Sequence, residues 1–231
     1  MDAAVIVAAG KGTRMGPGVD KLFLEVAGAP VVGHTWKRFD DHPSIDFLVL
    51  VIRSGLETDF TELGKTLKVT KPYRLAVGGA ERQDSVWNGL QALPTDCEVV
   101  AIQDGARPCT SADVIQRCLD AAHRSGASVA GQKATDTIKE ADSQGMIAKH
   151  LDRGKLWAVQ TPQCFQVPVI LKALALIRER GLVVTDDTAA CELAGQKVEL
   201  VESFAPNPKV TRPEDLAYID LILHKEPQRN P

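Results

Sequence analysis

Residues 3–16 read AAVIVAAGKGTRMG, in which a short apolar run leads directly into a turn rich in glycine and basic residues. Valine and isoleucine favour a buried strand, and the glycines permit the backbone conformations of a tight turn. A turn of this kind after a first strand often binds phosphate, because inward-facing backbone N–H groups attract an anion. The stretch therefore predicts the first strand of an α/β domain, followed by an anion-binding turn.

The alternation of apolar strands and amphipathic helices continues along the chain. Further strands are predicted at 45–52, 73–79 and 98–108, the last running into a turn, and helices at 30–39, 56–67, 82–93 and 112–126. Strands that alternate with helices of about 10–15 residues indicate βαβ units and a mostly parallel sheet. We expect a Rossmann-like α/β fold, with a mostly parallel twisted sheet flanked by helices, in a single domain over residues 1–231.

One segment, 129–165, breaks this alternation. The β-like pieces DTIKEA and GMIAKHL flank a polar turn at Asp142 to Gly145, which predicts an inserted β-hairpin arm at about residues 134–157. A projecting hairpin is marginally stable alone, and its apolar side chains need cover. These side chains are Ile138, Met146, Ile147, Leu151, Leu156 and Trp157. We therefore expect the arm to pack on a second subunit in a homodimer.

The composition limits the class of protein. Of the 231 residues, 44% are hydrophobic and 25% are charged, which is ordinary for a soluble enzyme. The net charge of -3 gives no general attraction to nucleic acid or membranes. The five scattered cysteines form no CxxC and indicate neither a disulfide framework nor a zinc site. No apolar run approaches the roughly 20 residues of a membrane helix, and no signal peptide is expected. A cytoplasmic protein fits best.

Three polar, glycine-bearing turns follow predicted strands, at 8–16, 78–85 and 104–108. Ligands of open α/β sheets bind beyond the carboxyl ends of the strands, so these turns are expected to form one site. In the first turn, Gly10 and Gly12 can form an anion nest, with Arg14 and Lys21 adding positive charge. The pattern is neither a Walker A loop nor the dinucleotide fingerprint, whose third glycine is missing. The sequence therefore gives little support to a nicotinamide-dependent oxidoreductase.

These blocks carry a family resemblance. AAGKGTRM, followed by Lys21, resembles the signature of the sugar-nucleotide pyrophosphorylase superfamily. Further blocks follow in order: GGAERQDSV (78–86), QDGARP (103–108), DTIK (136–139), DRGKLWAVQTPQCF (152–165), VTDDTAA (184–190) and NPKVTRPEDL (207–216). Together they resemble the 2-C-methyl-D-erythritol 4-phosphate cytidylyltransferases of the non-mevalonate isoprenoid pathway, from about residue 3 to 223. Asp20 departs from the family pattern, in which a proline usually precedes the lysine.

The resemblance implies a nucleotidyl transfer in which the substrate's phosphate attacks the α-phosphate of CTP and pyrophosphate leaves. This chemistry asks for cations and a divalent metal more than for a general base, because a phosphate monoester is already ionised near neutral pH. The implied catalytic residues are Arg14, Lys21 and Lys209. Asp104 is the implied ligand of Mg²⁺, which would neutralise the phosphates.

The resemblance also implies the binding residues. The implied CTP site contains Ala8, Ala9, Gly10, Gly12, Gly79, Ser85 and Asp104. The implied sugar-phosphate site contains Arg107, Thr185, Thr137, Arg153 and Thr161, of which the last three lie on the arm. In the family, this arm crosses to a second subunit and completes that subunit's site.

Each of these residues also has an ordinary interpretation. Arg14 and Lys21 could be solvated surface charges, Asp104 could cap a turn, and Thr185 could be only a helix N-cap. Lys209 could be an ordinary residue of a strand-like run, and Ser85 one of a helix's first turn. Two alternatives remain for the function: a cytidylyltransferase for another alditol phosphate, such as ribitol 5-phosphate, or a non-catalytic nucleotide-binding module on the same fold.

Overall fold

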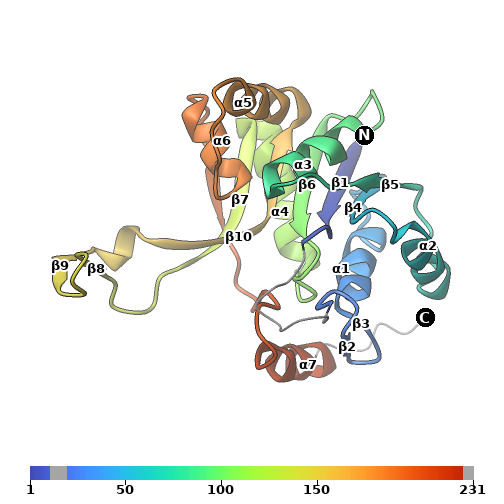
Figure 1. Cartoon of the computed structure of the whole chain (residues 1–231), viewed down its shortest axis with the longest axis horizontal. Helices are drawn as coiled ribbons and strands as arrows, with labels where there is room; N and C mark the ends of the chain where they lie inside the picture. Colours follow the sequence, from blue (N-terminus) through green and yellow to red (C-terminus); the bar gives the residue numbers. More distant parts are fainter. Residues whose placement is uncertain (11–19, 226–231) are drawn as a thin grey trace.

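The computed structural model describes residues 1–10 and 20–225 (Figure 1). The strands are β1 (Asp2–Val7), β2 (Glu25–Val26), β3 (Ala29–Pro30), β4 (Phe47–Ile52), β5 (Tyr73–Val77), β6 (Val99–Asp104), β7 (Ala127–Lys133), β8 (Lys139–Ala141), β9 (Ile147–His150), β10 (Trp157–Gln166) and β11 (Glu199–Glu202). The helices are α1 (Val31–Asp40), α2 (Glu57–Thr66), α3 (Arg82–Gln91), α4 (Ala112–Ser125), α5 (Val167–Glu179), α6 (Asp187–Leu193) and α7 (Asp215–Lys225), with a short 3-10 turn at Arg153–Lys155.

Within the described residues, seven strands form one sheet in the order β11-β7-β10-β6-β1-β4-β5. All neighbouring pairs are parallel except those of β10, which runs antiparallel to both β6 and β7. Every residue of β4 and β6 is buried, as expected for parallel strands that are covered on both faces. The predicted α/β fold with a mostly parallel sheet flanked by helices is confirmed.

Alternation of side chains along the strands builds two cores. On β1, Ala4 and Ile6 join the core beneath α1, α2 and α4. Ala3 and Val5 point to the opposite face and pack with residues of α3, α5 and α6. Because successive side chains of a strand point to opposite faces, a continuous apolar strand serves both cores at once.

The predicted helices are present within a few residues of their expected bounds. α4, for example, begins after Ser111, whose side chain accepts a hydrogen bond from the backbone N–H of Val114. It ends at Gly126, whose φ of 88° is the left-handed conformation that favours glycine. The sequence analysis did not predict the elements that follow the arm, which are β10, α5, α6, β11 and α7. β10 is the strand of this group that lies in the centre of the sheet, between β7 and β6. Its pairing with β7 shifts register between Val159 and Gln163, which interrupts any regular pattern.

The predicted hairpin is also present. β8 and β9 pair antiparallel around the turn at Asp142 to Gly145, and Figure 1 shows them on an arm that projects from the body between β7 and β10. The Gly145 N–H donates to the carbonyl of Asp142 at 3.1 Å. Met146 and Ile147 are 65% and 71% exposed within this chain. The arm therefore presents apolar side chains that the chain itself does not cover.

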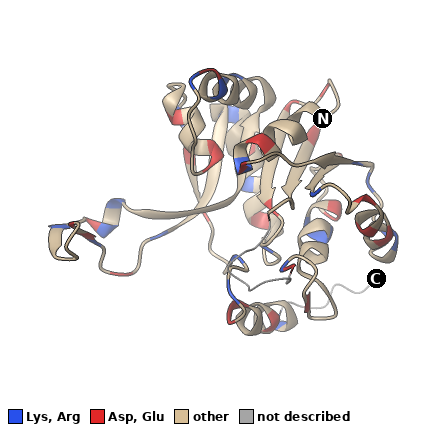
Figure 2. Ribbon diagram, viewed as in Figure 1, with Lys and Arg blue, Asp and Glu red and all other residues tan. Residues whose placement is uncertain are grey.

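Charged residues are mixed over the visible ribbon. In Figure 2, Lys and Arg alternate with Asp and Glu on the helices and on the arm, with no face of a single sign in this view. No helix in the described ranges has the length and apolar character needed to cross a membrane.

Candidate active site

A pocket of about 420 Å³ lies at the carboxyl ends of the parallel strands. Residues of the three predicted turns meet there, with Ala9 and Gly10 as the described pocket-lining members of the first, and Lys21 and Lys209 join them. The lining residues are Val7, Ala9, Gly10, Lys21, Leu22, Gly79, Ala80, Glu81, Arg82, Ser85, Asp104, Gly105, Ala106, Lys209 and Thr211. Topology brings them together, because β1, β5 and β6 all point their carboxyl ends to one edge of the sheet.

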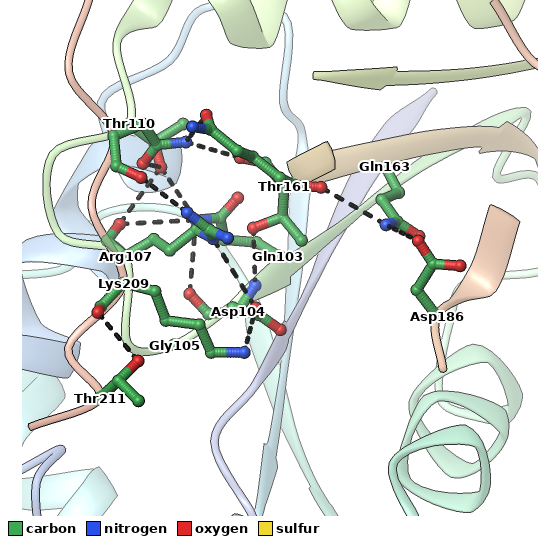
Figure 3. A network of polar contacts seen from close by, with 12 residues as sticks. Gln103, Asp104, Gly105, Arg107, Thr110, Thr161, Gln163, Asp186, Lys209 and Thr211 are labelled. Carbon is green, nitrogen blue, oxygen red and sulfur yellow. Dashed lines mark hydrogen bonds and ion pairs between the residues drawn. The ribbon is translucent and has the colours of Figure 1, made fainter. Parts of the chain in front are cut away.

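The Asp104 carboxylate is the electrostatic centre of the pocket. Among the described residues, three cations lie within ion-pair distance of it: Lys209 Nζ at 2.6 Å, Arg82 Nε at 3.5 Å and Arg107 Nε at 3.7 Å. Burial alone would raise the pKa of Asp104, but the charges of Lys209 and Arg82 outweigh it and lower the pKa to about 2. Figure 3 shows Lys209 and Arg107 approaching this carboxylate from different segments. The pocket wall therefore combines a buried carboxylate, Asp104, with several cations.

Arg82 is a pocket residue to which the sequence analysis gave no role. Its Nη1 lies 2.8 Å from Oδ2 of Asp187, the first residue of α6, whose side chain is buried. Burial would lower the pKa of Arg82, but the charges of Asp187 and Asp104 outweigh it and raise the pKa. Burial also raises the pKa of the Asp187 carboxyl, against the charge of Arg82. Both residues lie inside quoted motifs, but no spacing rule links positions so far apart.

Lys21 also lines the pocket. Its Nζ donates to the carbonyl of Val210 at 2.8 Å. The preceding Asp20 accepts a hydrogen bond from the Leu22 N–H at 3.1 Å and forms an ion pair with Arg53. Asp20 thus fixes the local backbone through a hydrogen bond and an ion pair. Gly12 and Arg14 lie outside the described residues.

A tight glycine turn forms another wall of the pocket. The Gly79 N–H donates to Ser85 Oγ at 3.1 Å, and Ser85 Oγ donates to the Glu81 carbonyl at 3.2 Å. A Cβ on Gly78 would lie 2.4 Å from the Cβ of Ala9, and one on Gly79 would lie 2.3 Å from the Cβ of Asp84. Both approaches are too close for a side chain, so this turn depends on glycine.

The expected CTP residues of the described ranges are near one another. Ala9, Gly10, Gly79, Ser85 and Asp104 line the pocket. Ala8 lies just beneath it and donates its N–H to the Val51 carbonyl at 2.7 Å. The remaining member of the set, Gly12, falls outside the described part of the chain.

The expected sugar-phosphate residues divide into two groups. Arg107 and Thr161 adjoin Asp104: Thr161 Oγ1 accepts a hydrogen bond from the Asp104 N–H at 3.2 Å (Figure 3). The expectation that Thr161 lies on the arm is wrong, because Thr161 is a buried residue of β10 within the central sheet. Thr137 and Arg153 lie on the arm, where Arg153 Nη1 donates to the Thr135 carbonyl at 2.8 Å. These two residues do not line the pocket of their own chain.

Thr185 is exposed beside α6 and is not among the pocket-lining residues. The interpretation of Thr185 as the helix N-cap is wrong. Asp186 is the N-cap, since its side chain accepts a hydrogen bond from the Ala189 N–H at 2.9 Å. A carboxylate in this position also suits the positive end of a helix.

Two carboxylate residues, Glu81 and Asp104, line this pocket, and Asp104 is the one held among cations. No group of three or more His, Cys, Asp or Glu side chains suited to a metal occurs in the described ranges. Mg²⁺ is commonly held by one or two carboxylates together with substrate phosphates. The buried, ionised Asp104 fits that mode of binding, in which the phosphates supply the other oxygens.

Comparisons with known proteins show the family of the chain. The family model described as IspD, 2-C-methyl-D-erythritol 4-phosphate cytidylyltransferase, matches residues 3–225. A protein of that name from Caldanaerobacter subterraneus subsp. tengcongensis is 41% identical over 227 residues, covering 96% of this chain and 99% of that protein.

Solved structures show the same fold. A 4-diphosphocytidyl-2C-methyl-D-erythritol synthase from Anaerococcus prevotii has a TM-score of 0.87 at 29% identity, covering 97% of this chain and 96% of that one. A 2-C-methyl-D-erythritol 4-phosphate cytidylyltransferase from Thermus thermophilus has a TM-score of 0.79 at 29% identity, covering 97% and 100%. With a family match over almost its whole length and a relative above 40% identity, the chain belongs to the 2-C-methyl-D-erythritol 4-phosphate cytidylyltransferase family.

Proposed function

We propose that this chain joins CTP and 2-C-methyl-D-erythritol 4-phosphate to give 4-diphosphocytidyl-2-C-methyl-D-erythritol and pyrophosphate, in non-mevalonate isoprenoid biosynthesis. One observation carries the proposal beyond family membership. Lys21 and Lys209, from opposite ends of the chain, reach one pocket, which glycine turns and Asp104 complete. Such a pocket suits two polyanionic substrates.

In the proposed reaction, a phosphate oxygen of the methylerythritol substrate attacks the α-phosphorus of CTP. The new P–O bond forms as the bond to the pyrophosphate leaving group breaks. Negative charge grows on the α-phosphate and on the leaving group, and we assign its stabilisation to Lys21, Lys209 and Arg14. Preorganised charges of this kind contribute a large part of the rate enhancement in phosphoryl chemistry.

The cytosine is assigned to the glycine-rich wall of the pocket. Ala8, Ala9, Gly10, Gly12 and Gly79 supply backbone donors and acceptors, and Ser85 supplies a hydroxyl. A pyrimidine has few polar edge atoms, so a narrow turn with fixed backbone groups suits it. A Cβ on Gly78 would lie 2.4 Å from the Cβ of Ala9, so the backbone of this turn packs closely against the turn after β1.

Mg²⁺ is the proposed cofactor, held by Asp104 together with the CTP phosphates. When bound, the ion would neutralise phosphate charge and favour departure of pyrophosphate. Lys209 Nζ lies 2.6 Å from the Asp104 carboxylate, so the same carboxylate orients a cationic side chain within the pocket.

The methylerythritol phosphate is assigned to Arg107, Thr161 and Thr185 of one subunit, with Thr137 and Arg153 from a partner's arm. The exposed apolar residues at the arm's tip support a homodimer through this arm. We further propose that the enzyme acts in the cytoplasm.

Pyrophosphate release tests the proposed function. The purified chain is assayed with Mg²⁺ and CTP, in separate reactions with 2-C-methyl-D-erythritol 4-phosphate and ribitol 5-phosphate. A much higher kcat/KM with the methylerythritol substrate is expected. Preference for ribitol 5-phosphate would support a cytidylyltransferase for that alditol phosphate. Binding of CTP without pyrophosphate release in either reaction would indicate a non-catalytic nucleotide-binding module.

A further inference from the structure

Asn207 is a buried amide that is hydrogen-bonded through both ends of its side chain. It is 3% exposed. Its Nδ2 donates to the Thr161 carbonyl at 2.8 Å and to Gln160 Oε1 at 3.3 Å. Its Oδ1 accepts a hydrogen bond from Thr110 Oγ1 at 3.1 Å. Only an amide supplies both donors and an acceptor on one short side chain.

The partners of Asn207 come from two other parts of the sheet edge. Gln160 and Thr161 belong to β10, and Thr110 lies in the loop between β6 and α4. From the turn after β6, Arg107 Nη1 adds a bond of 2.6 Å to the Asn207 backbone carbonyl. Thr110, Arg107 and Thr161 are seen converging in Figure 3. Asn207 therefore ties the segment before α7 to the floor of the pocket.

The tied segment carries Lys209 itself and the carbonyl that accepts a hydrogen bond from Lys21. Prolines at 206 and 208 restrict the backbone on either side of Asn207. Lys209 follows and reaches Asp104 at 2.6 Å. Val210 donates its N–H to the Ala106 carbonyl at 2.8 Å, and its own carbonyl accepts from Lys21 Nζ at 2.8 Å. One anchored strip thus sets the positions of Lys209 and Lys21.

We propose that Asn207 is a positioning residue that acts on catalysis through Lys209 and Lys21. The inference rests on the proposed function for the part that these lysines play in turnover. Loss of the amide would release the strip from β10 and from the Thr110 loop while leaving both lysines present. Misplacement of reacting groups by about 1 Å can cost about 10²-fold in rate.

The first test is a mutant cycle on pyrophosphate release. Asn207→Ala is expected to lower kcat about 10- to 100-fold, with a smaller change in the KM for CTP. Added to Lys209→Ala, it should cause a smaller loss than it does in the wild type, because residues that act as a unit are not additive. Ser203→Ala is the matched control: Ser203 is buried in the same segment, donates to the Ala205 carbonyl at 3.2 Å and should leave kcat nearly unchanged.

The second test does not depend on activity. Amine acylation of the free protein, followed by mass spectrometry of peptides, measures how accessible Lys209 is. Release of the strip should raise Lys209 labelling in Asn207→Ala, relative to the exposed Lys65 and to Ser203→Ala. Thermal unfolding checks that each variant is folded at the assay temperature. Asn207→Asp, which keeps the side-chain volume but loses both donors, replaces Asn207→Ala if the latter is unfolded.

The outcomes separate this inference from the proposed function. A wild-type chain that releases no pyrophosphate would contradict the function, and the labelling would still test the tether. Multiplicative losses in the cycle, or unchanged Lys209 labelling in a folded Asn207 variant, would overturn the positioning role.

Discussion

Lys209 Nζ lies 2.6 Å from Oδ2 of Asp104, although the two residues are 105 positions apart in the chain. The same carboxylate also faces Arg82 and Arg107. Without it, several cations would repel one another inside a partly buried pocket. Asp104 therefore stabilises the arrangement of cations that we assign to the triphosphate, in addition to its proposed part in metal binding.

This role predicts a specific dependence of stability on pH. The folded-state pKa of Asp104 is about 2, below its ordinary value of 3.8. A depressed pKa stabilises the fold above the ordinary value, and that stability is lost as pH falls through the folded value. The contribution is about 2 kcal/mol. Below about pH 4, the free energy of unfolding measured with urea should therefore fall less with decreasing pH in Asp104→Asn than in the wild type. Parallel curves for the two proteins would contradict the assignment.

The ion pair between Arg82 and Asp187 predicts a large effect on stability. Arg82→Ala leaves the buried Asp187 carboxylate without its cation, which typically costs about 3–5 kcal/mol. The pKa of Asp187 is already raised by burial. Protonation of Asp187 then removes the unpaired charge, so the stability lost in Arg82→Ala should be larger at alkaline than at mildly acidic pH. Chemical denaturation at several pH values measures this difference.

Two further variants serve as controls for this pair. Arg82→Ala combined with Asp187→Asn should recover part of the lost stability, because no buried charge is left unpaired. Arg124→Ala removes an exposed ion pair, in which Arg124 Nη2 lies 3.0 Å from Glu199 Oε1. Exposed pairs contribute about 0–1 kcal/mol. Equal losses for Arg82→Ala and Arg124→Ala would show that burial of Asp187 has no special consequence.

Much of the fold could be predicted because a strand that is buried on both faces of a sheet consists of consecutive apolar residues, which are easily recognised in the sequence. β1 and β4 are such strands, and glycine marks the end of α4 at Gly126. β10 could not be predicted in the same way. It is antiparallel, changes register between Val159 and Gln163 and is only partly buried, so its pattern has no regular period.

The site divides along similar lines. Turns that follow parallel strands must meet at one edge, so the positions of Gly79 and Asp104 followed from the order of elements. The family resemblance supplied Lys209, which ordinary pattern analysis leaves undecided. The pairing of Arg82 with Asp187 and the contacts of Asn207 join distant segments. Such pairings depend on tertiary packing and leave no local periodicity.

The glycine turn predicts a substitution that is not tolerated. Gly79→Ala places a Cβ 2.3 Å from the Cβ of Asp84, and this contact involves the backbone of α3's first turn. The turn must shift, and with it the N–H that bonds Ser85. We expect a strongly raised KM for CTP in steady-state assays. Gly33→Ala is the control, since its Cβ would meet Leu67 at 3.4 Å in ordinary contact. A normal KM for CTP in Gly79→Ala would remove this wall from the nucleotide site.

The arm gives the last prediction. Arg153 lies on an exposed arm away from its own pocket, which is lined by Lys21 and Lys209. If Arg153 serves the partner's site, Arg153→Ala should raise the KM for the sugar phosphate far more than that for CTP. Lys21→Ala should lower turnover about 10²- to 10³-fold, as is typical for loss of one preorganised charge.

Mixing the two variants tests whether these residues act in one shared site. After subunit exchange, a mixed dimer holds one site with both Lys21 and Arg153 intact and one site with neither. Activity should therefore return in part, which a mixture of independent monomers cannot do. Differently tagged subunits confirm exchange, and sedimentation velocity gives the oligomeric state. Monomers at the assay concentration, or no recovery after proven exchange, would mean that each chain completes its own site and that the exposed residues of the arm have another partner.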